Sequence, residues 1–264
     1  MHGPIPHFHI MSAHRIWRNV LISSVVFLGA LAVALVPGVF DRPLTELINS
    51  FVGRSALFDS LVAALATFPT FSGAILMAFI WSCWFGTKDL ESRARILVGT
   101  LAASGTGMVS RLSQHAFSTH PRPIHDPSIH FLAPGGYVET YNTWDSFPSD
   151  HVAVLAGLVV VIYIARSRYA IFAIIWTALV EPARIFTGAH YPSDLIGGAA
   201  LAAVVVWIAQ ASWPISLGGR VMKWEQSSPS LFYMSAFFLT YQITTLFGDI
   251  RFTFSPLIRH MFSS

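Results

Sequence analysis

The sequence is poor in charged residues and almost lacks cysteine. Only 11% of its 264 residues are Asp, Glu, Lys or Arg, whereas a typical soluble domain contains about 25%. Cys83 is the only cysteine, which excludes an intrachain disulfide and a metal cluster built from cysteines. The net charge is only +3 and no basic run is present, so no nucleic-acid partner is expected.

Long apolar segments are what the sequence has in abundance. Hydrophobic residues make up 54% of the chain and the mean hydropathy is +0.59. An apolar helix of about 20 residues can cross a bilayer. The pattern therefore predicts an all-α, polytopic transmembrane bundle of six core spans. The expected spans are 19–37, 70–86, 96–117, 150–165, 169–187 and 193–212.

The segments between and after these spans have mixed polarity. Residues 41–66 predict helices near the membrane interface, and residues 231–247 predict a seventh helix, either transmembrane or interfacial. The expected organisation is an N-terminal cytoplasmic tail (1–18), a transmembrane domain (19–217) with a long loop (118–148), and a C-terminal extension (218–264). Lys and Arg are more frequent in the loops that lie inside when the N-terminus is cytoplasmic. Loop 118–148 then lies outside.

Three polar clusters follow one another at the ends of the expected spans, on that outer face. Ionisable groups at membrane depth are costly and usually functional. The clusters are His115, His120, Pro121, Arg122 and Pro123; Pro148, Ser149, Asp150 and His151; and Arg184, His190 and Asp194.

These residue types suit phosphoryl transfer. Two arginines can bind the oxygens of a phosphate with paired hydrogen bonds. A neutral histidine can attack phosphorus if a carboxylate holds its tautomer, and a protonated histidine can give a proton to the leaving oxygen. Ser149 precedes an expected helix and can cap it, so that backbone N–H groups face an anion.

The spacing of the clusters resembles three motifs of one family. That family reads Lys, six residues, Arg-Pro; then Pro-Ser-Gly-His; then Ser-Arg, five residues, His, three residues, Asp. This chain has Arg122-Pro123, then Pro148-Ser149-Asp150-His151, then Arg184, His190 and Asp194 at the family spacing. Over about residues 60–212 it resembles the type 2 phosphatidic acid phosphatase superfamily of lipid phosphate phosphatases and vanadium haloperoxidases, in its bacterial membrane branch.

The resemblance implies a role for each matching residue. His190 would be the nucleophile, forming a phosphohistidine that Asp194 orients, and His151 would be the acid for the leaving group and then the base for water. Arg122, Arg184 and Ser149 would hold the phosphate. The resemblance implies neither a metal nor another cofactor.

Three positions depart from the family pattern. His115 stands where the family has Lys, which makes it a candidate phosphate ligand; Ala183 replaces Ser and removes a hydroxyl. Asp150 replaces Gly, and its carboxylate would either weaken anion binding or hold His151 in its protonated form.

Three further side chains are candidates for supporting the site. Arg111 lies one helical turn before His115 on the same face, and His120 lies close to the first motif; either would compensate for the missing Lys. Glu181 is expected to be a buried structural acceptor or a partner for Arg184.

The expected protein is an integral membrane lipid phosphatase that cleaves a phosphate ester or anhydride, with polyprenyl (undecaprenyl) diphosphate as the first candidate substrate. Phosphatidic acid, phosphatidylglycerol phosphate and lipid A remain alternative substrates. A lipid phosphotransferase and a non-catalytic lipid-binding protein are alternative functions. The expected partners are a lipid-linked phosphate and membrane lipids, and the oligomeric state stays open. The expected location is the bacterial inner membrane, with the site facing the periplasm or exterior.

Overall fold

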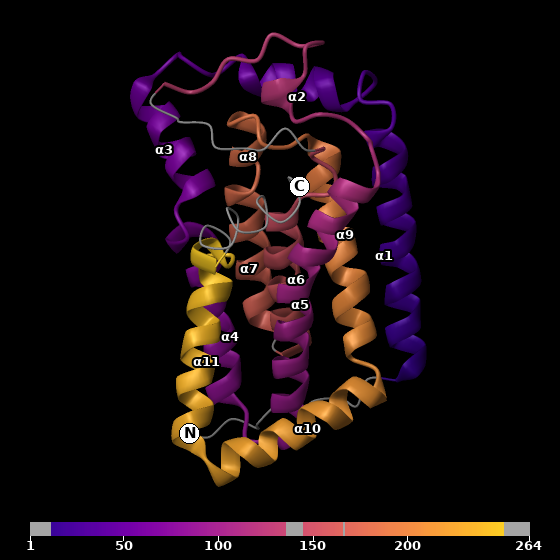
Figure 1. The fold of residues 1–264 in the computed structure, drawn as a ribbon, viewed down its shortest axis with the longest axis vertical. Coiled ribbons are helices and arrows are strands. Elements are labelled where there is room, and N and C mark those ends of the chain that lie inside the picture. Colours follow the sequence, from indigo (N-terminus) through magenta and orange to yellow (C-terminus); the bar gives the residue numbers. More distant parts are fainter. Residues whose placement is uncertain (1–11, 136–144, 166, 251–264) are drawn as a thin grey trace, which may run out of the picture.

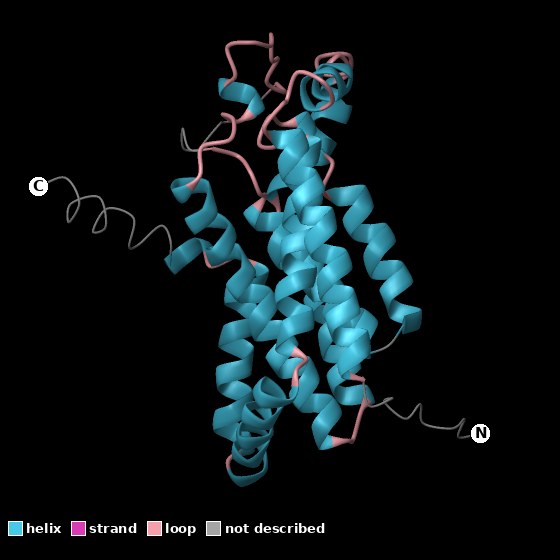
Figure 2. Ribbon diagram, turned by 90° about the vertical axis from the view of Figure 1, so that its right-hand side faces the viewer, coloured by secondary structure: helices cyan, strands magenta, loops and turns pink. Residues whose placement is uncertain are grey.

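The computed structural model describes residues 12–135, 145–165 and 167–250, and this part of the chain contains helices and no strands (Figures 1 and 2). The α-helices are α1 (Ala13–Ala34), α2 (Asp41–Asn49), α3 (Ala56–Thr67), α4 (Ile75–Gly86), α5 (Leu90–Ala116), α6 (Asp150–Ala165), α7 (Ser167–Val180), α8 (Ala183–Phe186), α9 (Pro192–Ala209), α10 (Ser212–Ser227) and α11 (Pro229–Thr244). A π-helix, η1 (Thr70–Ala74), precedes α4, and a 3-10 turn, η2 (Pro123–His125), lies in the long loop.

The observed helices follow the expected spans with shifted ends. Helix α1 begins before residue 19 because the Ser12 hydroxyl caps it, accepting a hydrogen bond from the Arg15 N–H at 3.3 Å. Helix α5 begins at Leu90 because Asp89 caps its first turn, accepting from the Ser92 N–H at 2.8 Å. Capping side chains satisfy N–H groups that have no partner within the helix.

Three helical segments of the described chain are long and apolar enough to cross a membrane: Ala13–Ala34, Tyr169–Phe186 and Pro192–Ala209. The segments Ala56–Thr67 and Thr70–Gly86 would make a fourth span if counted together, bent by 64°. Helix α6 is apolar but has only 16 residues. The all-α fold is therefore confirmed, whereas the count of six spans stays a prediction.

The bundle has two distinct ends. Helices α2 and α8 lie at one end, and α10 crosses the other end (Figure 1). Helix α1 runs from the α10 end to the α2 end, and α11 runs beside α4 in the half of the bundle nearer α10 (Figure 1). Figure 2 shows that the longest loops gather at the α2 end.

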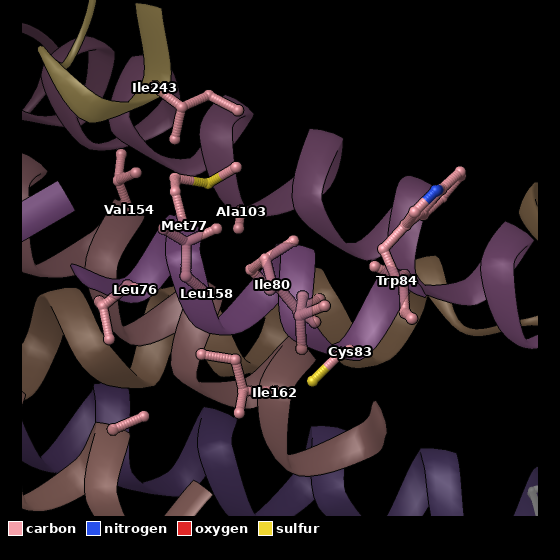
Figure 3. Close-up of a cluster of buried hydrophobic side chains, with 14 of the residues drawn as sticks. Leu76, Met77, Ile80, Cys83, Trp84, Ala103, Val154, Leu158, Ile162 and Ile243 are labelled. Carbon is pink, nitrogen blue, oxygen red and sulfur yellow. The ribbon is translucent and has the colours of Figure 1, made fainter. Parts of the chain in front are cut away.

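Helices α4, α5, α6 and α11 share one apolar core (Figure 3). Its members include Leu76, Met77, Ile80, Cys83, Trp84, Ala103, Val154, Leu158, Ile162 and Ile243. Helices α5 and α6 approach closely at Gly157, where a Cβ would lie only 2.9 Å from the Ala103 Cα. Small residues allow such close helix packing in lipid.

Other apolar side chains point away from the core. Leu21, Val25 and Leu28 on α1, and Phe172 and Leu179 on α7, are all exposed. An outward apolar surface on long helices is what contact with lipid requires.

Candidate active site

His190 lies in the short connection between α8 and α9, at the α2 end of the bundle. The connection turns at Gly188, which has a φ of +76°, a backbone conformation that favours glycine. A Cβ at Gly188 would also lie 2.6 Å from the Phe131 ring. This tight turn packs the connection against the long loop, and the His190 side chain is almost completely buried.

The two nitrogens of the His190 ring have different surroundings. Nδ1 lies 3.0 Å from the carbonyl oxygen of Ser146 and 3.4 Å from Asp194 Oδ2. Because both partners accept hydrogen bonds, they favour the tautomer with the proton on Nδ1. Nε2 lies 3.5 Å from the Arg122 Nη1, which also donates to the Ala189 carbonyl at 2.7 Å. Nε2 then carries the lone pair beside a cation.

Burial lowers the pKa of His190, and the positive charge of Arg122 acts in the same direction, although Asp194 opposes them. The neutral form of His190 is therefore favoured over the pH range in which an ordinary histidine would begin to take up a proton. A neutral, oriented imidazole is the form that can act as a nucleophile.

Asp194, in the first turn of α9, joins two histidines. Oδ2 faces His190 and accepts from the Tyr191 N–H at 2.7 Å, while Oδ1 lies 3.3 Å from His120 Nε2. Burial opposes the charge on His120, but the charge and hydrogen bond of Asp194, together with the Pro121 carbonyl and Asp41, outweigh burial and raise the pKa of His120. The sequence named His120 only as a possible support for the first motif. Its contact with Asp194 bridges 74 positions, which no local spacing could reveal.

The second motif is held against the third through the backbone. The Ser149 N–H donates to the Asp194 carbonyl at 3.0 Å, and the Ser149 hydroxyl accepts from the Val152 N–H at 3.4 Å. The predicted N-cap role of Ser149 is therefore confirmed. From α5, the Ser110 hydroxyl donates to the Pro148 carbonyl at 2.7 Å.

Asp150 bridges two basic side chains. Arg111 Nε donates to Asp150 Oδ2 at 2.8 Å, and His151 Nδ1 lies 3.3 Å from Asp150 Oδ1. Arg111 thus reaches the second motif, as its position on α5 allowed. His115 lies in the last turn of α5 with an exposed side chain, whereas His151 is half-buried and His190 is almost completely buried.

Arg184 is buried in α8 and has partners on both sides. Its Nε lies 3.3 Å from Glu181 Oε2, and its Nη2 donates to the Ala66 carbonyl at the end of α3 at 3.0 Å. Glu181 is therefore the partner of Arg184, one of the two alternatives that the sequence left open. These contacts hold the guanidinium in place.

Helix α2 contributes contacts that the sequence did not predict. The side chain of Asp41 accepts hydrogen bonds from the Ser193 N–H and hydroxyl at 2.9 and 2.5 Å. Arg42 Nε donates to Asp126 at 2.9 Å, and the Tyr191 hydroxyl donates to the same carboxylate at 2.7 Å. Residues 41–66 were expected only to lie near the membrane interface. Helix α2 also ties the long loop to the start of α9.

Comparison with known proteins agrees with the fold. Residues 93–217 match the model of the PAP2 superfamily. The chain is 22% identical over 158 residues to the undecaprenyl-diphosphatase BcrC of Bacillus subtilis, covering 60% of this chain and 76% of that protein. It is 28% identical over 99 residues to a lipid A 1-phosphatase of Rhizobium johnstonii, covering 37% of this chain and 39% of that protein.

Two further relatives extend the comparison. An undecaprenyl-diphosphatase of Sulfolobus acidocaldarius is 31% identical over 99 residues, covering 37% of this chain and 47% of that protein. The fold is similar to the crystal structure of a transmembrane PAP2-type phosphatidylglycerolphosphate phosphatase from Bacillus subtilis. The TM-score is 0.50 with 15% identity, over 73% of this chain and 94% of that one.

The fold and the matches together define the class as an integral membrane phosphatase. Residues 93–217 form a PAP2 superfamily domain, so the resemblance drawn from the three motifs is confirmed. Helices α1 to α4 and α11 lie outside the matched residues.

Proposed function

We propose that this protein cleaves the phosphate of a lipid through a phosphohistidine formed on His190. The lone pair of His190 Nε2 attacks phosphorus while the bond from phosphorus to the leaving oxygen breaks. The observation that carries the proposal is that the two ring nitrogens of His190 have different surroundings. Nδ1 faces the Ser146 carbonyl and Asp194, and Nε2 lies beside Arg122.

His151 is proposed to manage the protons of both half-reactions. It gives a proton to the leaving oxygen in the first step and takes one from water in the second. The water oxygen then attacks phosphorus, the bond between phosphorus and Nε2 breaks, and inorganic phosphate leaves. Asp150 supports this role because its carboxylate faces His151 Nδ1, and because its ion pair with Arg111 balances its negative charge.

Arg122, Arg184 and Ser149 are proposed to hold the phosphate oxygens. Arginine favours phosphate because its planar group offers paired donors. Ser149 lies at the start of α6, where N–H groups and the helix dipole favour an anion. His115 is proposed as a weaker ligand in the position of the family's Lys.

Polyprenyl diphosphate is the proposed substrate. Two relatives of different organisms carry the name undecaprenyl-diphosphatase, and a membrane phosphatase can bind such a phosphate while the hydrocarbon stays in the bilayer. Phosphatidic acid, phosphatidylglycerol phosphate and lipid A phosphates are the alternatives. The site is proposed to face the periplasm or exterior, because α1 begins at the opposite end of the bundle from α2 and α8 (Figure 1) and its N-terminus is expected inside.

The proposal is tested by phosphate release from each of these lipids by purified protein in detergent. His190→Ala is expected to abolish release and the acid-labile ³²P label that the wild type retains after a short exposure to labelled substrate. His130→Ala is the matched control, since this loop histidine is exposed and should keep wild-type activity. Activity in the His190→Ala protein would disprove the assignment of the nucleophile.

Two outcomes of the same assay identify the alternative functions. Product formed only when an acceptor lipid is added would indicate a phosphotransferase, and binding of lipid without any release would indicate a non-catalytic protein. Asp150→Gly and His115→Lys restore the family residues. A changed preference among the lipids in either variant is expected if these positions select the substrate.

A further inference from the structure

A cavity of about 410 Å³ lies between α5, α6 and the end of α11. Its size falls within the range of about 300–1,000 Å³ that is usual for small-molecule sites. One part of its wall is polar and consists of Arg111, Asp150 and His151. The rest is largely apolar. The cavity therefore begins at the proposed general acid and continues along hydrocarbon-like surface.

The apolar wall comes partly from outside the PAP2 domain. Leu239 belongs to α11, and Leu246 and Phe247 follow its end, whereas the family match ends at residue 217. Leu246 and Phe247 have φ values of 51° and 56°, which non-glycine residues adopt only where the surroundings hold them. The turn they form aims two large apolar side chains at the cavity.

The end of α11 is seated directly on η1. A Cβ at Gly73 would lie 2.5 Å from the Thr244 carbonyl oxygen, so only glycine allows this approach. The close contact places the turn after α11 opposite α5, and it explains how a helix outside the family domain can form one side of the cavity.

The α5 side of the cavity faces outward. Met108 is 64% exposed and Leu101 is 45% exposed, and both line the cavity. Gly105, between them, is exposed, and a Cβ there would meet no atom within 4 Å. A hydrocarbon chain could enter from the bilayer through this side without displacing a side chain.

We propose that the cavity holds the part of the lipid tail next to the phosphate, and that the end of α11 is a wall that selects among tails. The inference rests on the proposed phosphatase function. The proposed occupant of the cavity is the hydrocarbon of the substrate, because the polar end of the cavity is made by His151 and its ion-paired neighbours. A bulk membrane lipid in the same place would compete with the substrate rather than extend from the site.

The proposal is tested by a substitution on α5 that places a larger side chain in the cavity. Gly105→Leu places a side chain in open space, so the fold should tolerate it. It is expected to lower kcat/KM for farnesyl diphosphate by about tenfold or more, since one methylene in an apolar pocket is worth roughly 10- to 200-fold in specificity. Hydrolysis of p-nitrophenyl phosphate, which has no tail, should be unchanged. Phe247→Ala should raise the KM for farnesyl diphosphate and leave the KM for p-nitrophenyl phosphate unchanged.

Gly29→Leu on α1 is the matched control, because a Cβ at Gly29 also meets nothing within 4 Å and the position does not line the cavity. It should leave both substrates unaffected. Equal activity of Gly105→Leu and wild type toward farnesyl diphosphate would overturn the proposal, and so would an equal loss with both substrates, which would indicate damage to the site.

A wild-type protein that hydrolyses neither substrate would refute the phosphatase function and not the cavity. In that case, a farnesyl phosphonate carrying a photoreactive group on its tail tests whether the cavity binds the tail. Labelling of peptides from α5 and α11 that Gly105→Leu reduces would support the cavity, and labelling that Gly105→Leu leaves unchanged would refute it.

Discussion

Gly198 lies one helical turn after Asp194 in α9, where that helix touches the second motif. A Cβ at Gly198 would lie 2.5 Å from the Ser149 carbonyl oxygen and 3.3 Å from the Ala153 N. Ordinary van der Waals contact begins at 3.4 Å. In Gly198→Ala, α9 and the start of α6 must therefore separate by about 0.9 Å, the difference between 3.4 and 2.5 Å. Both atoms in the way belong to backbone, so no side chain can rotate to make room.

This separation would pull the nucleophile and the proposed acid apart. The Ser149 N–H bonds to the Asp194 carbonyl at 3.0 Å, and this bond joins the two motifs. A misplacement of about 1 Å in catalytic geometry can cost roughly 100-fold in rate. We expect a loss of that size in kcat. Forcing an extra methyl into packed space costs about 1–3 kcal/mol of stability, partly offset by roughly 1 kcal/mol from the better helix propensity of alanine.

Phosphate release and thermal unfolding of the purified variant measure the two effects. Gly29→Ala on α1 is the control, since it makes the same chemical change where a Cβ meets nothing within 4 Å. It should gain helix stability and keep full activity. A Gly198→Ala protein with the wild-type rate would refute the reasoning, because it would show that the two motifs tolerate separation or are further apart than described.

Three other changes test individual contacts. Because Asp194 raises the pKa of His120 against the effect of burial, their interaction should stabilise the fold fully below about pH 6.5 and weaken as pH rises through the folded-state pKa of His120. The difference in Tm between wild type and His120→Asn should therefore shrink as pH rises. A difference in Tm that stays constant with pH would contradict this. Asp126→Asn weakens a buried acceptor of two side chains, so it should cost about 1–3 kcal/mol in chemical denaturation, and an unchanged midpoint would argue against the α2 contacts. Gly73→Ala should displace the end of α11 and speed amide hydrogen exchange there, with unchanged exchange as the contrary result.

The pH–rate profile provides a separate check on His190. Because burial lowers its pKa, the nucleophile stays neutral below the ordinary histidine value of about 6.5. The acid limb of kcat/KM is therefore expected below that pH. An acid limb above it would mean that the charged form persists, which the surroundings of His190 do not favour.

The helical class and the three motifs could be predicted because both depend on residues near one another in sequence. Apolar runs predict helices, and Arg184, His190 and Asp194 all lie within the short segment 184–194. Helix ends were less predictable, since Ser12 and Asp89 extend α1 and α5 by capping bonds. The number of spans also stays open, because α6 is short.

The residues that act around the motifs could not be predicted, since their partners are distant in the chain. Asp41 meets Ser193 across 152 positions and Arg42 meets Asp126 across 84. The sequence of a charged segment such as 41–49 fits an interfacial helix as well as a helix that binds buried partners. It therefore does not predict these contacts.

The amino-acid sequence by itself determined the class of the protein: an apolar helical chain whose histidines and arginines follow the PAP2 spacing. Only the tertiary structure decided how these groups are used. Asp194 faces His120 as well as His190, Asp150 pairs with Arg111, and α11 forms the wall of a cavity that begins at His151. The reason is physical. Local spacing sets helix periodicity and motif order, whereas the partner of a buried charge depends on which helices pack together.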